Sequence, residues 1–196
     1  MNTYFRKGLF LAIIISSFLT VFFGTSIQKA TSAQNCVEPP SGLVSWWSVD
    51  TISGTTVPDI KGKNNGTLGR NGFTTVPGKV GNAFDSGQNG DIKIGNPANL
   101  NFGSGPFSLE VWFKWEGRRI GDSVDEIIRK STYTGSSPGP GYWLMVLNTP
   151  QGNILEFHVG DLIDVGHAVA RRATAPIVSG VWYHAVATLD HDIMKL

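Results

Sequence analysis

The 196-residue sequence contains little cysteine and little charge. Its one cysteine, Cys36, excludes a disulfide within the chain and a zinc site built from several cysteines. Charged residues make up 16% of the chain, against roughly 25% in an average soluble protein, and the formal net charge is only +1. Because no basic surface is indicated, we expect no nucleic-acid partner.

The first 33 residues have the pattern of a secretory signal peptide. The basic pair Arg6-Lys7 precedes an apolar run over residues 9–23, and the segment contains no acidic residue. Small residues end the segment, so we expect a signal-peptide helix that is cleaved after Ala33. A membrane span needs about 20 apolar residues, and this run is shorter. We therefore expect the segment to contact the membrane only transiently. An uncleaved membrane anchor is the alternative.

Cleavage would place the protein outside the cytoplasm. It would remove three basic and no acidic residues, leaving 13 Lys and Arg against 15 Asp and Glu. We therefore expect a secreted or cell-surface protein, periplasmic if it is retained there, with weak electrostatic steering. In this oxidising compartment, Cys36 would be a free thiol or would pair with a cysteine outside the sequence.

The rest of the chain indicates a linker over residues 34–42 and one all-β domain over residues 43–196. Short apolar runs alternate with clusters of Gly, Pro, Asn and Asp, a pattern typical of antiparallel sandwiches. We predict a two-layer antiparallel β-sandwich, a concanavalin A-like jelly roll. The expected strands are 43–49, 83–85, 91–94, 107–115, 126–130, 142–147, 154–159, 167–173 and 182–189.

Three of these segments allow finer predictions. Alternation over residues 107–115 places Trp112 on the face opposite the apolar one, away from the core. Residues 182–189 are apolar on both faces, which predicts a central strand covered on both sides. Residues 122–130 fit a strand or a short helix.

Residues 194–196 resemble the start of a further strand, so we expect a C-terminally truncated domain of a longer multidomain protein.

Five segments in series resemble LamG-like (laminin G-like) domains of the concanavalin A type. They are the opening Gly42–Asp50, the Asp-x-x-Gly-x-Asn-x-Gly loop within Asp59–Leu68, the Gly-Lys-Val-Gly-x-Ala-Phe segment Gly78–Phe84, and the strands Phe107–Lys114 and Trp182–Ala187. The resemblance implies a jelly-roll module that binds carbohydrate or an extracellular protein. It also implies closing strands after a segment similar to residues 194–196.

The resemblance further implies two kinds of site. Jelly-roll domains of this type often hold calcium, which prefers carboxylate, amide and backbone carbonyl oxygens. Asp50, Asp59 and Asn65 are the candidate ligands, and the alternative is that Asp59 and Asn65 shape turns through bonds to the backbone.

A carbohydrate site would use exposed aromatic side chains. The candidates are Trp112, Tyr142 and Trp143. Strand alternation would direct one of Tyr142 and Trp143 inward and the other outward. For Trp112, packing against a second layer is the alternative.

We predict a non-catalytic protein. Glycoside hydrolases of the same fold need two carboxylates across the scissile bond, in one branch within a Glu-x-Asp-x-x-Glu strand. The nearest acidic cluster, residues 122–126, lacks this spacing, and no metalloprotease, phosphate-loop or dinucleotide motif is present. A glycoside hydrolase, a structural spacer and a remnant without its own activity are the alternatives to a binding module.

Overall fold

The computed structural model describes residues 38–69, 74–87, 90–103, 105–117, 124–131, 140–150, 152–160, 168–191 and 193–196. The predicted signal peptide and residues 34–37 of the predicted linker, Cys36 among them, lie outside these residues. The chain divides into two compact units, Met1–Glu38 and Pro39–Leu196, and the second contains all the elements below. Among the described residues, no helix has the length and apolar character needed to cross a membrane.

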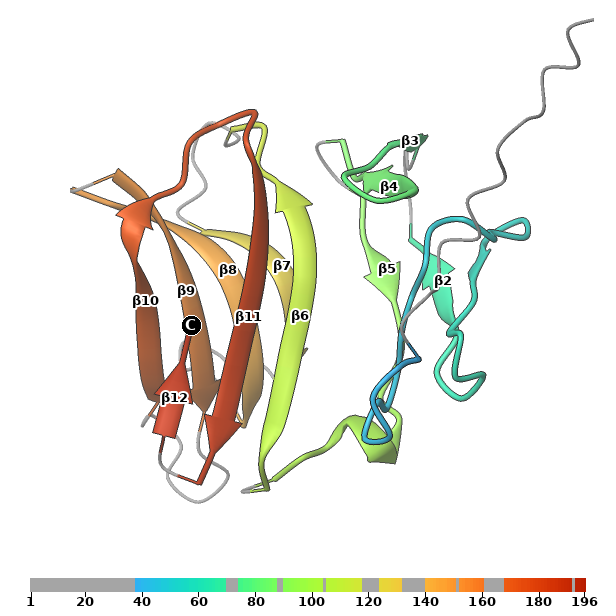
Figure 1. Cartoon of the computed structure of the whole chain (residues 1–196), viewed down its shortest axis with the longest axis horizontal. Coiled ribbons are helices and arrows are strands. Elements are labelled where there is room, and N and C mark those ends of the chain that lie inside the picture. The colour runs from blue at the N-terminus through green and yellow to red at the C-terminus, as the bar shows by residue number, and fades with distance from the viewer. Residues whose placement is uncertain are drawn as a thin grey trace, which may run out of the picture. The chain divides into compact units, whose positions relative to one another are not determined.

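The second unit is all-β, and its sheets are antiparallel (Figure 1). The larger sheets have the strand orders β10-β9-β8-β7 and β12-β11-β6, and the smaller ones are β1-β2-β5 and β3-β4. The elements are β1 (Thr56–Val57), β2 (Gly66–Leu68), β3 (Thr74–Pro77), β4 (Asn82–Asp85), β5 (Ile92–Lys93), the 3-10 turn η1 (Ala98–Leu100), β6 (Phe107–Lys114), β7 (Val124–Ser131), β8 (Gly141–Thr149), β9 (Gly152–Gly160), β10 (Ala168–Pro176), β11 (Trp182–Asp190) and β12 (Ile193–Lys195).

The two larger sheets enclose the main hydrophobic core, which gives the unit a β-sandwich-like architecture (Figure 1). Every second side chain of a strand points to the same face, so each sheet contributes one apolar face. The core includes Phe107 and Phe113 from β6, Leu144 from β8, Phe157 from β9 and Ala187 from β11. Phe107 and Phe157 meet edge to face, with ring centroids 6.0 Å apart.

Most strand predictions in the second half of the chain are confirmed, with ends shifted by a few residues. The ambiguous segment 122–130 contains β7, a strand. Three strands were not predicted: β1, β2 and β3. Each has two to four residues, too few to show a clear alternation.

Two strand predictions were wrong. Residues 43–49 form no strand, and only an isolated bridge joins Trp47 to Asp59. β11 is buried on one face alone, because its outward Val186 is exposed. The strand covered on both faces is β8, in which all five residues from Tyr142 to Val146 are buried. The apolar residues on both faces of 182–189 therefore wrongly predicted that this strand is covered on both sides.

We predict that Phe157→Ala lowers the free energy of unfolding by about 3–5 kcal/mol, because it opens a cavity between the two sheets. The matched change Val169→Ala, at an exposed position on β10, should stay within about 0.5 kcal/mol of the wild type. Guanidinium denaturation followed by circular dichroism measures both. Equal effects of the two substitutions would contradict the assignment of the core.

Candidate functional site

The outward side of the β6–β11 pair carries aromatic and charged side chains. The register places Trp112 opposite His184, Glu110 opposite Val186 and Lys114 opposite Trp182. Residues directly opposite in an antiparallel pair share a face, so these six side chains form one surface. We call this surface, made by Glu110, Trp112, Lys114, Trp182, His184 and Val186, the outer face.

Trp112 is the centre of the outer face. Its indole is 43% exposed and stacks on the His184 ring, with centroids 4.7 Å apart and planes 19° apart. His184 Nε2 in turn lies 2.9 Å from Glu110 Oε1. Lys79 Nζ lies 5.9 Å from the indole centroid, at the outer limit of a cation–π contact. The position of Trp112 away from the core is as the alternation predicted.

Tyr142 and Trp143 do not join Trp112 on this surface. They point to opposite faces of β8, as the alternation predicted, but they are only 7% and 6% exposed, so neither offers the exposed ring that a carbohydrate site would use. Tyr142 lies in the core, its hydroxyl donates to the Leu100 carbonyl at 3.3 Å, and burial raises its pKa to about 12. Trp143 lies on the opposite face of β8, 5.1 Å from the His158 ring. The alternation is intact, but both faces of β8 are covered.

Asp59 organises the loop between β1 and β2. Its buried carboxylate accepts four bonds: Oδ1 from the backbone N–H groups of Trp46 and Lys61 at 2.9 and 3.0 Å, and Oδ2 from the N–H of Asn64 and the hydroxyl of Ser45 at 3.0 and 3.1 Å. Burial acts to raise the pKa of Asp59, but these four bonds favour the charged form and together lower it.

The two other predicted calcium ligands also bind protein groups. Asn65 Oδ1 accepts the backbone N–H of Asp59 at 2.9 Å. Asp50 accepts the N–H of Asn82 at 2.9 Å and the hydroxyl of Ser48 at 2.8 Å. The N–H bond from Asn82 holds the pKa of Asp50 below its usual value, with Ser48 acting in the same direction.

The geometry does not fit calcium at Asp59. A cation would have to displace N–H donors from Asp59, whose two oxygens already accept two bonds each. Within the described part of the chain, no group of three or more His, Cys, Asp or Glu side chains is placed to hold a metal ion. The observed bonds are those of the turn-shaping alternative.

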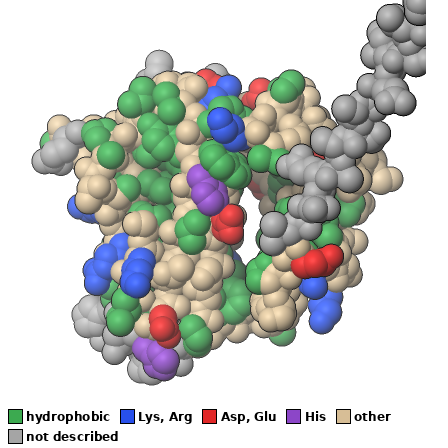
Figure 2. Space-filling model, viewed as in Figure 1, with side chains coloured by type: hydrophobic (Ala, Val, Ile, Leu, Met, Phe, Trp, Pro, Cys, Tyr) green, Lys and Arg blue, Asp and Glu red, His purple; other side chains and the backbone are tan. Residues whose placement is uncertain are grey.

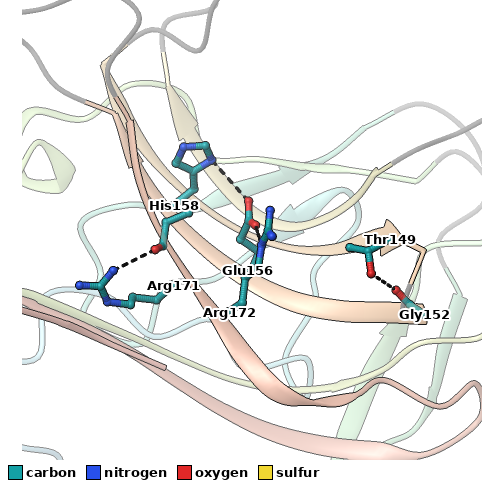
Figure 3. Close-up of polar contacts among 7 residues, drawn as sticks. Thr149, Gly152, Glu156, His158, Arg171 and Arg172 are labelled. Carbon is teal, nitrogen blue, oxygen red and sulfur yellow. Dashed lines mark hydrogen bonds and ion pairs between the residues drawn. The ribbon is translucent and has the colours of Figure 1, made fainter.

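The outward face of the four-stranded sheet holds a polar cluster that the sequence analysis missed (Figure 3). Glu156 is only 4% exposed, and its Oε2 accepts from Arg172 Nε on β10 at 2.6 Å. His158 Nδ1 lies 3.7 Å from the other carboxylate oxygen. The position of Glu156 between the apolar residues Leu155 and Phe157 could have indicated a buried charge in the sequence. The sequence does not show which strand supplies the positively charged partner.

A second glutamate shares this face. Glu126 of β7 and Glu156 of β9 both lie opposite Met145 of β8, one on each side. Glu126 accepts from Arg129 Nη1 at 3.1 Å, and Glu156 binds Arg172. Each carboxylate therefore has an arginine partner, Arg129 for Glu126 and Arg172 for Glu156.

The comparisons with known proteins identify no relative. No protein-family model, curated protein or solved structure matches the chain. The assignment of a function therefore depends on the geometry of the described residues.

Asp59→Asn should lower the free energy of unfolding by about 2–4 kcal/mol, because the amide nitrogen cannot accept the bonds that one carboxylate oxygen accepts. The pKa of Asp59 is lower in the folded protein than its value of 3.8 in the unfolded chain. The charged carboxylate therefore stabilises the fold fully above pH 3.8, and this stabilisation is lost as the pH falls below that value. The Tm difference between wild type and variant should therefore be constant near neutral pH and shrink below pH 3.8.

Asp91→Asn is the control, since the Asp91 carboxylate is exposed and lies 3.9 Å from an exposed Lys93. Thermal unfolding from pH 2.5 to pH 7 measures all three proteins. A loss for Asp59→Asn that is no larger than the loss for Asp91→Asn would refute the organising role of Asp59.

His158 should make the fold sensitive to mild acid. Burial of the ring lowers its pKa below 6.5, Glu156 partly opposes this, and Arg172 adds to it. Because the unfolded chain then binds more protons than the native one, stability falls as the pH drops through 6.5. The variant His158→Gln should lose this dependence. The control is His191→Asn, which removes an exposed histidine. Asparagine tolerates the φ of 52° at this position, and the control variant should keep the pH dependence of stability.

Proposed function

We propose that the chain is an exported, non-catalytic binding module that recognises carbohydrate through the outer face. The observation that carries this proposal is the exposed Trp112 indole, held against His184 on the β6–β11 pair. The all-β architecture and the resemblance to LamG-like jelly rolls support a module of this class. Secretion and a position at the cell surface or in the extracellular space are part of the same proposal.

The outer face has the two properties that a sugar site needs. An aromatic ring offers an apolar surface against which the C–H groups of a sugar ring can pack. Polar groups beside it fix the orientation of the ligand through hydrogen bonds. Glu110 and His184 supply an acceptor and a ring nitrogen next to Trp112, and Lys114 lies near Trp182, with its Nζ 5.8 Å from that ring.

The outer face is also preorganised. β6 and β11 pair over eight consecutive positions, and the inward residues of both strands are packed in the core. The backbone beneath Trp112 is therefore held in place, and the His184 ring restricts the rotation of the indole. A ligand that binds here loses less free energy to ordering the site than it would on a loop.

The alternatives have less support. A glycoside hydrolase would need two carboxyl groups placed across a scissile bond, whereas Glu126 and Glu156 are each bound by an arginine. A protein ligand would also suit exposed aromatic residues, and the experiment below separates it from carbohydrate. Calcium has no part in this proposal.

Trp112→Ala should weaken binding to oligosaccharides at least tenfold, because it removes the stacking surface. The measurement is a titration of the full chain by isothermal calorimetry with neutral hexasaccharides of glucose, mannose and galactose. Trp46→Ala is the matched control, since Trp46 is another exposed tryptophan and lies outside the outer face. Binding that Trp112→Ala leaves unchanged, or no binding to any of these sugars, would overturn the carbohydrate proposal.

A further inference from the structure

The outer face carries a second tryptophan beside Trp112. Trp112 lies opposite His184, and Trp182 lies two positions before His184 on the same strand. The two tryptophans are therefore diagonal neighbours on one face, at a spacing of roughly 7–8 Å. Trp182 is half-buried, so it is not sealed within the core. Figure 2 shows this side of the β6–β11 pair, where hydrophobic, basic, acidic and histidine side chains lie next to one another.

Each of the two tryptophans has a lysine at nearly the same distance. Lys79 Nζ lies 5.9 Å from the ring centroid of Trp112, and Lys114 Nζ lies 5.8 Å from that of Trp182. Lys114 also forms an ion pair with Glu116. An ammonium group has three N–H donors, so Lys114 can hold Glu116 and still donate to a ligand. The outer face and its border thus repeat the same unit twice, an indole with an ammonium group beside it.

The turn that carries Lys79, between β3 and β4, is fixed from two sides. Within the turn, the N–H of Gly78 donates to the Gly81 carbonyl at 2.8 Å. Next to it, the N–H of Asn82 donates to the Asp50 carboxylate at 2.9 Å. Gly81 has a φ of 58°, and a Cβ atom there would lie 2.6 Å from Asp50 Oδ1, so only glycine fits. Lys79 therefore projects from an ordered backbone.

The backbone around Trp182 is fixed as well. Before β11, the N–H of Gly180 donates to the Trp115 carbonyl at 2.8 Å. The N–H of Val178 donates to the hydroxyl of Tyr183 at 2.9 Å. Trp182 lies between these two anchored positions and is paired with β6. Both tryptophan–lysine units are thus held in place before any ligand binds, which lowers the entropic cost of binding.

We infer that the two tryptophan–lysine units are two subsites for one oligosaccharide, whose sugar units pack on Trp112 and Trp182. The inference rests on the proposed function and narrows its ligand to a chain of at least two sugar units laid along β6 and β11. Each indole takes the C–H face of one unit, and each lysine donates to oxygens of that unit. The other end of the outer face, Glu110 and Val186, has no aromatic ring, so the chain runs from Trp112 towards Trp182.

The first experiment measures how affinity depends on chain length. The full chain is titrated by isothermal calorimetry with the monosaccharide, disaccharide and tetrasaccharide of glucose, mannose and galactose. Because the second unit of a bound chain meets its subsite at a high effective concentration, the wild type should bind the disaccharide about tenfold more tightly than the monosaccharide. Trp182→Ala should reduce this ratio to less than about threefold, and Trp182→Phe, which keeps a ring, should restore most of it. The control Trp46→Ala should keep the wild-type ratio.

The second experiment tests the same subsite without altering an indole. Lys114→Gln removes the ammonium group beside Trp182, so it should lower the ratio of disaccharide to monosaccharide affinity about threefold. Lys61→Gln, at an exposed lysine outside the outer face, is the control and should keep the ratio. Circular dichroism of each variant checks its fold, and Lys114→Gln decides the question if Trp182→Ala does not fold.

The outcomes separate this inference from the proposed function. Sugar binding with no gain from the second unit, or a gain that both Trp182→Ala and Lys114→Gln leave intact, would overturn the two subsites while carbohydrate binding stands. Equal losses of monosaccharide and disaccharide affinity in Trp182→Ala would show a single site, and they too would overturn the inference. Absence of binding to every sugar of every length would overturn both.

Discussion

The period of two along each strand links the core of this protein to its surface. Any residue that enters the space between the two larger sheets directs its chain neighbours to the opposite face. Burial of Phe113 and Val111 on β6 therefore sets Trp112 outward, and burial of Ala185 on β11 does the same for His184. The stack of Trp112 on His184 depends on the β6–β11 register, because a slip of either strand by one residue would turn its ring toward the core and away from the other ring.

Two buried carboxylates, those of Asp59 and Glu156, are both stabilised by hydrogen-bond donors around them. Asp59 is surrounded by N–H and O–H donors from its own loop, and Glu156 is bound by Arg172 from the neighbouring strand. A buried carboxylate without such partners would destabilise the fold strongly. Residues 43–49 form no strand, and the carboxylate of Asp59 instead binds the hydroxyl of Ser45 and the N–H of Trp46 within this segment.

The sequence predicted those features that depend on local pattern. The alternation from Phe107 to Lys114 was clear enough to place the strand and the orientation of Trp112. It could not show that both faces of β8 are covered, because coverage depends on segments distant in the sequence. For this reason the outward direction of Trp143 did not make it an exposed residue. Arg172 lies 16 positions from Glu156, and only the β9–β10 register brings them together. The sequence left two roles open for Asp59, a calcium ligand or a residue that shapes its turn through bonds to the backbone, and the observed bonds are those of the second role.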